Sequence, residues 1–151
     1  MKYLLIIFFT FANISFSATN NQKAPQFTLN SSNNKSLSLK DFSGKWVVLE
    51  WFNKGCPFVK KFYEVNKMQE LQKQYTDKNI IWLSIISSAK GKQGHETPAE
   101  AIKTREKWQI KSSHTLLDID GVVGKKYDAK TTPHIFIINP KQDLVYQGAI
   151  D

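Results

Sequence analysis

The strongest constraint on the fold is an apolar segment that leads through a short turn into an amphipathic pattern. Residues 46–52 are apolar apart from Glu50, which is the pattern of a buried strand. Gly55-Cys56-Pro57 follows. From about Pro57 to Thr76, apolar residues recur at spacings of three and four, which predicts a helix packed on a core. Proline suits the first helical turn because no backbone N–H needs a partner there. The apolar positions of this helix are Phe58, Phe62, Val65, Met68, Leu71 and Tyr75.

Strand and helix patterns alternate along the rest of the chain. Ile80 to Ile86 is apolar nearly throughout, as in a central parallel strand covered on both faces. A loop from Ser87 to Thr97 precedes a helix from Pro98 to about Trp108, and short alternating runs around Asn33-Asn34 predict a hairpin. This order predicts an α/β sandwich with a partly parallel sheet, an N-terminal β-hairpin and one inserted loop-helix segment. Further strands are expected at Thr115–Leu117, Ile135–Ile138 and Leu144–Tyr146.

The first 17 residues have the pattern of a signal peptide. Lys2 supplies a positive charge, Tyr3 to Ile14 is almost unbroken apolar sequence, and Ser15-Phe16-Ser17 offers small residues before Ala18. The apolar run is too short for a spanning helix of about 20 residues, so no stable membrane insertion is expected after cleavage. An uncleaved anchor or a buried N-terminal helix is the alternative. We therefore expect a signal peptide at 1–17, a domain at 18–151, and a periplasmic or secreted protein.

The charge of the chain argues against nucleic acid as a partner. The formal net charge is +8, but Arg105 is the only arginine and the lysines are scattered through every segment. A nucleic-acid reader is expected to use arginine forks in a clustered patch. The lysines are interpreted as a solvated basic surface.

The single cysteine, Cys56, is unusual for an exported chain, since such chains use paired cysteines as disulfides. It lies where a strand turns into a helix, and unpaired N–H groups at a helix N-terminus favour a thiolate. Lys54, Lys60 and Lys61 lie close in sequence, which also favours the thiolate. The sequence favours a reactive thiol, and an inert core cysteine is the alternative.

Several segments resemble the redoxin-type proteins of the thioredoxin-fold superfamily. They are Ala24-Pro25-Gln26-Phe27-Thr28-Leu29, residues 39–49, Gly55-Cys56-Pro57-Phe58-Val59, and Thr131-Thr132-Pro133. Together with Gly91-Lys92-Gln93-Gly94-His95, they are most similar to the exported peroxiredoxin-like group with a single cysteine in Cys-Pro-Phe-Val. The likeness covers about Ala24 to Asp151 and implies a thioredoxin-like sandwich.

The resemblance also implies roles for individual residues. Cys56 matches the attacking cysteine, and Pro133 matches a proline that faces it across a cis Thr132–Pro133 bond. Pro57, Thr132 and Pro133 are then expected to bind substrate. Glu50 matches a buried acid that moves protons for the thiol. Its alternative is a carboxylate that points to water at a sheet edge.

Three departures from the family pattern restrict the activities that the resemblance implies. Val59 stands where a second thioredoxin cysteine would be, so no internal dithiol cycle is possible. Leu49 and Asn53 replace the Pro and Thr of true peroxiredoxins, and Pro133 replaces their arginine, so strong peroxidase activity is not expected. Two hypotheses remain. One is a monothiol oxidoreductase of the cell envelope, with an external thiol reductant or a disulfide-bearing protein as partner. The other is a non-catalytic binding module that uses the groove beside the cis-proline.

Other candidates carry less chemistry. His95 lies in a loop and could be near the thiol. His134 follows Pro133 and could be near the thiol or only pack at the end of a strand. For His114 the sequence suggests no interaction partner. Three scattered histidines and one cysteine do not give zinc spacing, and residues 118–121 lack the further ligands of a calcium loop. Residues 90–94 lack the ending of a P-loop. No metal and no cofactor are expected.

The chain stops soon after its last predicted strand, at Gly148-Ala149-Ile150-Asp151. The resemblance implies a closing helix there, so the domain is expected to lack its C-terminal helix and a further cysteine beyond it. The alternative is a short protein that covers this sheet face with its hairpin or by dimerising.

Overall fold

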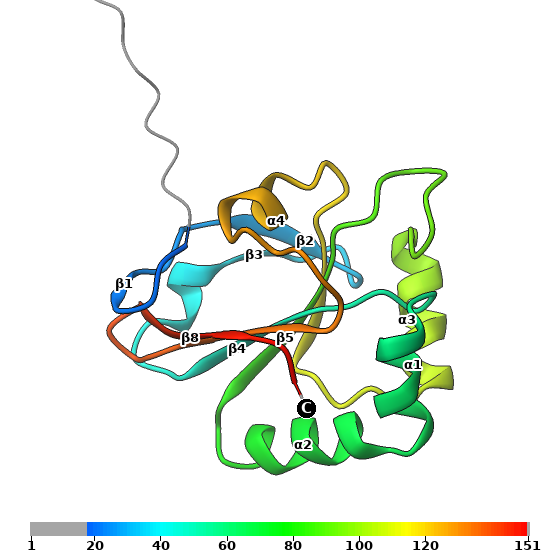
Figure 1. Ribbon diagram of the computed structural model, residues 1–151, viewed down its shortest axis with the longest axis horizontal. Helices are drawn as coiled ribbons and strands as arrows, with labels where there is room; N and C mark the ends of the chain where they lie inside the picture. The colour runs from blue at the N-terminus through cyan, green and yellow to red at the C-terminus, as the bar shows by residue number, and fades with distance from the viewer. Residues whose placement is uncertain (1–17, 151) are drawn as a thin grey trace, which may run out of the picture.

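The computed structural model describes residues 18–150, so the predicted signal peptide lies outside the described residues. The described residues form one sheet in the order β1-β8-β7-β4-β5-β6-β2-β3, flanked by helices (Figure 1). The strands are β1 (Gln22–Lys23), β2 (Thr28–Ser31), β3 (Ser36–Ser38), β4 (Val47–Trp51), β5 (Ile81–Ile86), β6 (His114–Leu117), β7 (His134–Ile138) and β8 (Asp143–Gly148). The helices are η1 (a 3-10 turn, Leu39–Phe42), α1 (Pro57–Glu64), α2 (Lys67–Thr76), α3 (Pro98–Lys107) and α4 (Val122–Lys126).

The centre of the sheet matches the sequence prediction. β5 pairs in parallel with β4 on one side and with β6 on the other, and β7 runs antiparallel to β4. The predicted hairpin is confirmed as β2 and β3, with Leu29 opposite Leu37. The predicted α/β sandwich with a partly parallel sheet, an N-terminal hairpin and a loop-helix insertion is therefore confirmed.

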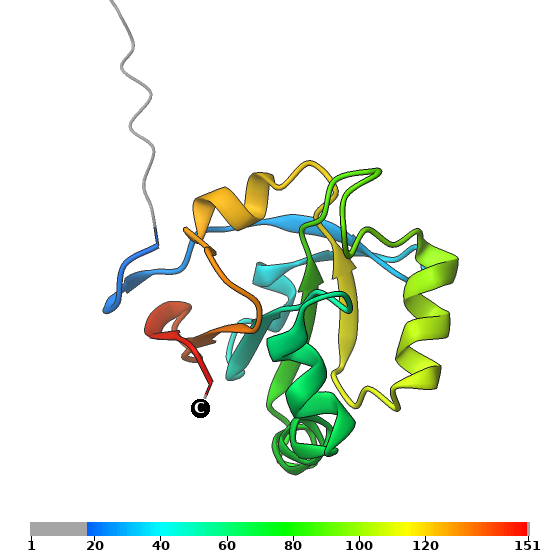
Figure 2. The same ribbon diagram turned by 45° about the vertical axis from the view of Figure 1, so that its right-hand side comes forward.

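Alternation along β4 divides the apolar side chains between two cores. Val47, Leu49 and Trp51 belong to a core beneath α4 and the N-terminal segment. Val48 and Phe52 belong to the opposite core, which packs beneath α1, α2 and α3. Figure 2 shows α3 standing beside α1 on that second face. Glu50 shares the pleat direction of Val48 and Phe52, so its carboxylate enters the second core.

The prediction of one helix from Pro57 to Thr76 is wrong. Asn66 has a left-handed backbone (φ 59°) and separates α1 from α2. Asparagine tolerates this conformation better than most residues. The break also shifts the buried face, because Phe58 and Val65 are each 69% exposed while Val59, Tyr63 and Met68 are buried.

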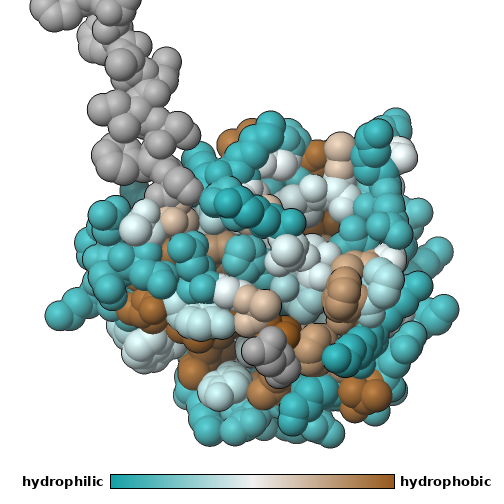
Figure 3. Space-filling model, in the orientation of Figure 1, coloured by the Kyte–Doolittle hydropathy of each residue, from teal (hydrophilic) through white to brown (hydrophobic). Residues whose placement is uncertain are grey.

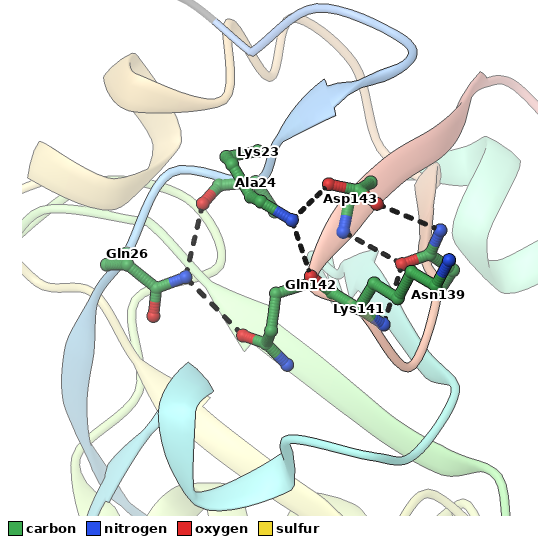
Figure 4. A network of polar contacts seen from close by, with 7 residues as sticks. All are labelled: Lys23, Ala24, Gln26, Asn139, Lys141, Gln142 and Asp143. Atoms are coloured by element: carbon green, nitrogen blue, oxygen red, sulfur yellow. Dashed lines mark hydrogen bonds and ion pairs between the residues drawn. The ribbon is translucent and has the colours of Figure 1, made fainter.

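The polar segment at the start of the described chain adds the edge strand β1, which pairs with β8. Lys23 forms an ion pair with Asp143 at 2.6 Å and also donates to the backbone oxygen of Lys141 (Figure 4). Gln26 donates to Gln142, which belongs to the same β7–β8 turn. The start of the domain is thus fixed to the edge of β8 by polar contacts that no apolar pattern could reveal.

Within residues 18–150, none of the helices is both long and apolar enough to cross a membrane. The face drawn in Figure 3 is hydrophilic over much of its area, and apolar side chains gather in its lower half. Val145 and Tyr146 on β8 are 36% and 41% exposed, as an edge strand allows.

Candidate active site

Cys56 caps the N-terminus of α1, at the point where the chain leaves β4. Its backbone oxygen accepts the hydrogen bond of Lys60 N, which begins the helix, and Pro57 occupies the first helical position. The side chain is neither fully buried nor fully exposed, and its sulfur is a free thiol. Sγ lies 3.1 Å from the backbone oxygen of Thr132, to which the thiol donates. The predicted strand–turn–helix position of Cys56 is confirmed.

The pKa of the Cys56 thiol lies below its ordinary value. Partial burial acts in the opposite direction and is the largest single influence. The Thr132 hydroxyl and the backbone N–H groups of Val59 and Phe58 outweigh it together, because all of them favour the thiolate. In the thiol form Cys56 makes no side-chain cap hydrogen bond, so these donors gain their acceptor when the proton leaves.

The lysines expected to lower this pKa have other partners or positions. Lys54 forms an ion pair with the buried carboxylate of Glu96 at 2.9 Å. The ammonium of Lys61 lies 5.7 Å from the ring centroid of Phe62. Hydrogen-bond donors, rather than ammonium groups, therefore account for the lowered pKa of Cys56.

A loop that precedes α3 closes over the turn that carries Cys56. Asn53 Oδ1 accepts from Gly55 N at 2.8 Å, and Asn53 Nδ2 donates to the backbone oxygen of Gln93. Gln93 Nε2 donates in return to the backbone oxygen of Gly55 at 3.2 Å. A Cβ on Gly55 would lie only 2.6 Å from Gln93 Cγ, so glycine is needed for the close approach. Residues 91–95 of this loop were part of the family resemblance in the sequence, but the sequence did not indicate that the loop forms hydrogen bonds with the Cys56 turn.

The Thr132–Pro133 peptide bond is cis, as the resemblance implied. Pro133 is buried, and Thr132 lines a small hollow of about 220 Å³ together with Trp51, Asn53, Ser87 and Lys130. Sγ of Cys56 donates to the backbone oxygen of Thr132, which is one of the residues that line this hollow. Pro57 lies next to Cys56 at the start of α1 and is exposed.

Glu50 is fully buried, so the alternative of a carboxylate at a sheet edge is wrong. Its Oε1 accepts from the hydroxyl of Tyr63 at 2.7 Å. Its Oε2 accepts from Gln72, Trp82 and Ser84 at 2.9, 2.8 and 3.3 Å. Burial raises the pKa of Glu50, and the four donors oppose that effect only in part. These four partners were missed from the sequence, since polar residues within apolar patterns carry no sign of which carboxylate they face.

The contacts of the three histidines are with residues other than Cys56. His95 Nδ1 lies 2.9 Å from the backbone oxygen of Ser88, and the ring of His134 packs against Phe136 at 4.4 Å. Burial lowers the pKa of His134 and also that of His114, whose ring lies 6.2 Å from Phe42. In the part of the chain described, no three His, Cys, Asp or Glu side chains gather as metal ligands.

Asp118 has a structural role that excludes the calcium-loop reading. It is fully buried, and its carboxylate accepts from Ser87 Oγ at 2.5 Å, Val123 N at 3.1 Å and Gly124 N at 2.8 Å. Ser87 Oγ in turn accepts from Trp51 Nε1 at 2.9 Å. The network joins the ends of β4, β5 and β6 to α4, and so supports the hollow beside Thr132.

Solved structures share this architecture over most of the chain. A hypothetical protein from Sinorhizobium meliloti 1021 has 23% identity and a TM-score of 0.78, covering 89% of this chain and 73% of its own. An uncharacterized conserved protein from Geobacillus kaustophilus has 26% identity and a TM-score of 0.78, with coverages of 92% and 71%. The thioredoxin domain of a thiol-disulfide oxidoreductase from Bacteroides vulgatus has 21% identity and a TM-score of 0.69, with coverages of 88% and 90%.

These likenesses confirm the predicted thioredoxin-like fold. A comparison with curated proteins found no match. The family comparison is decisive for membership, because the AhpC/TSA family matches residues 20–147 of the 151. The chain belongs to the AhpC/TSA family.

Proposed function

We propose that this protein is a monothiol oxidoreductase that acts through Cys56. The Cys56 thiolate attacks one sulfur of a disulfide, forms a mixed disulfide with it, and releases the other sulfur as a thiolate. A second thiolate, from outside the chain, then attacks the mixed disulfide and regenerates Cys56. Over one cycle the substrate disulfide releases one thiolate, and its other sulfur leaves in a disulfide with the external thiol. A second external thiol then exchanges with that disulfide to complete the two-electron reduction. The external partner is a thiol reductant or a disulfide-bearing protein.

The observation that carries the proposal is the environment of the Cys56 sulfur. The thiol is partly accessible, belongs to the N-cap residue of α1 and has a lowered pKa. Thiolate character together with access is what distinguishes reactive cysteines from inert ones. Residues 1–151 contain one cysteine, so the sulfur that resolves the mixed disulfide comes from outside these residues.

Disulfides suit this site better than peroxides. Neither Leu49 nor Asn53 carries a hydroxyl that could donate to a peroxide, and the amide of Asn53 is already engaged with Gly55 and Gln93. Pro133 cannot supply the charged donor that an arginine would. Weak peroxidase activity, through a sulfenic acid on Cys56, is the most that we assign.

The remaining proposed site residues divide into two groups. Pro57, Thr132 and Pro133 border the thiol, and an extended substrate segment can lie along them. Glu50 lies in the core beneath α1 with both oxygens bonded to other side chains. We therefore assign it the role of a buried acid that holds or releases a proton near the helix, without contact with the substrate.

Residues 1–17 are proposed as a signal peptide and residues 18–151 as the mature domain, which places the protein in the periplasm or outside the cell. The support is the pattern of Lys2, the apolar run and the small residues before Ala18. The mass of the processed product tests it, since cleavage after Ser17 leaves Ala18 as the first residue.

The proposal is tested with Cys56→Ser in parallel with the unchanged protein. We expect disulfide reduction to be lost while the unfolding transition stays in place, because serine is nearly isosteric with cysteine. Alkylation rates measured against pH report the pKa of the thiol. An ordinary pKa near 8.5, together with slow reaction toward all disulfides, would instead favour the binding module.

A further inference from the structure

A pocket of about 550 Å³ opens between α1 and α3, next to the turn that carries Cys56. The turn contributes Lys54 and Gly55, α1 contributes Lys60, and α3 contributes Lys103 and Lys107. Figure 1 shows α1 and α3 on the same side of the molecule. Its volume is in the range of small-molecule sites, which run from about 300 to 1,000 Å³.

The charge in this pocket is mostly positive. Among the residues that the structure describes, ion pairs are found for Lys54 but not for Lys60, Lys103 or Lys107. Glu100 is the one acid in the lining, and its carboxylate is already bonded to the backbone and hydroxyl of Thr97. Glu64 faces an adjoining pocket that shares Lys107 and Trp108, and Glu106 lines a different one.

Two of the lysines repel each other along α3. Lys103 and Lys107 are four residues apart on α3, so their ammonium groups lie over one helix face. Like charges at this spacing destabilise a helix by a few tenths of a kcal/mol. A carboxylate between α1 and α3 would relieve that repulsion and would also meet Lys60. Trp108 and the methylene stems of the lysines offer apolar surface for the rest of a ligand.

The pocket is joined to the thiol by the chain itself. Lys54 and Gly55 precede Cys56 directly, and Lys60 N donates to the backbone oxygen of Cys56 at 3.0 Å. A small ligand with one end among the lysines can therefore present a sulfur to Cys56.

We propose that this pocket selects small, carboxylate-bearing disulfides and thiols as the substrates and resolving partners of Cys56. The inference rests on the proposed function. In the first step Cys56–S⁻ attacks the disulfide R–S–S–R, the S–S bond breaks, and R–S⁻ leaves as Cys56–S–S–R forms. In the second step a different carboxylate-bearing thiolate, R′–S⁻, attacks the mixed disulfide at the sulfur of R, which forms R–S–S–R′ and releases Cys56–S⁻. The lysines bind the carboxylates of the small molecule both when its disulfide is attacked and when its thiolate resolves the mixed disulfide.

The test uses three aliphatic disulfides that differ mainly in charge: dithiodipropionate, hydroxyethyl disulfide and cystamine, which are dianionic, neutral and dicationic. The rate of mixed-disulfide formation on Cys56 is followed by mass. At low salt the dianion should react at least tenfold faster than the dication, since electrostatic steering changes association rates by about 10 to 1,000-fold. Salt should reduce the difference.

Variants locate the effect. Lys60, Lys103 and Lys107 are replaced together by glutamine, which keeps helix propensity while removing three charges. The matched control replaces exposed lysines elsewhere, Lys45, Lys125 and Lys141, also by glutamine. The pocket variant should lose most of the preference for the dianion, and the control should keep it. Unfolding curves check that both triple variants are folded.

The outcomes separate the two proposals. If the unchanged protein reacts with none of the three disulfides, the proposed function fails and the pocket inference with it. If it reacts with all three at similar rates, or if both triple variants lose the preference equally, the pocket inference is overturned while the monothiol function stands.

Discussion

At the scale of single residues, the reactivity of Cys56 depends on Thr132. The backbone oxygen of Thr132 accepts from the thiol, and its hydroxyl favours the thiolate. We expect Thr132→Val to raise the pKa of Cys56, because valine keeps the β-branched shape and removes the hydroxyl. The pH midpoint of iodoacetamide alkylation should move upward. Thr131→Val, at an exposed neighbouring position, is the control and should leave the midpoint unchanged. Equal midpoints in all three proteins would contradict the role of Thr132.

Glu50 makes stability depend on pH, because burial raises its pKa above the ordinary 4.5. The folded state then holds the proton more tightly than the unfolded state does. The stabilising contribution is complete below about pH 4.5 and is lost as the pH rises through the folded pKa. Relative to Glu50→Gln, which carries no titrating proton, the unchanged protein should lose unfolding free energy across that range. Urea unfolding at several pH values measures the difference, and parallel curves for the two proteins would contradict it.

The site residues differ in how far sequence could identify them. Cys56 lies in a strand–turn–helix pattern, and Pro133 lies just before a strand. Both patterns are local and can be recognised without knowing the tertiary structure. Glu50 stood out as a carboxylate in an apolar strand, but its direction depended on which face of the sheet was covered. Tyr63, Gln72, Trp82 and Ser84 come from three different elements, so only the folded arrangement reveals that they surround one carboxylate.

At the scale of elements, the loop before α3 acts on the active-site turn through Gly94. Gly94 has φ 82°, and a Cβ there would overlap the Asn53 side chain that holds Gly55. Gly91 in the same loop has φ 78° but open space around its Cα. Gly91→Ala should therefore cost only the left-handed backbone, about 1–2 kcal/mol, and makes a matched control. Gly94→Ala should cost about 2–4 kcal/mol, because overpacking adds to the same strain.

The two glycine variants should also differ in the chemistry of Cys56. Displacement of Asn53 in Gly94→Ala releases the turn, so alkylation of Cys56 should change in rate, while Gly91→Ala should react as the unchanged protein does. Chemical unfolding and alkylation measured on the same samples test both effects. The loop would be independent of the site if the two variants were equally stable and equally reactive.

Strands and helices could be predicted from sequence where their burial requires a regular pattern of apolar residues. β4, β5 and β7 lie at the centre of the sheet, and their apolar runs gave their positions to within a residue or two. The break at Asn66 gave no such signal, because the spacing of apolar residues continues across it and only the left-handed φ of one residue ends the helix. β1 has two polar, exposed residues and exists because β8 offers an open edge, which is a property of the folded sheet.

At the scale of the whole molecule, residues 18–24 close the sheet rather than lead into it. Ala18 N donates to the backbone oxygen of Lys126, Asn21 N to that of Leu144, and Ala24 N to that of Gln142. Ala18 and Ala24 are both buried in the core beneath α4. β1 also pairs with β8, which would otherwise present an unpaired edge.

This closure predicts how the domain responds to its starting point. A chain of residues 18–151 should unfold at the same urea concentration as the full chain of residues 1–151, because Ala18 keeps its place and its amino group can still donate to the backbone oxygen of Lys126. A chain of residues 25–151 loses the three backbone hydrogen bonds named above, the β1–β8 pairing, the Lys23–Asp143 ion pair and two buried alanines. At about 0.5–1.5 kcal/mol per hydrogen bond, it should be less stable by about 2–4 kcal/mol and should self-associate through β8. Urea unfolding and sedimentation compare the two chains. Equal stability and equal mass in solution would show that residues 18–24 neither stabilise the domain nor protect the edge of β8.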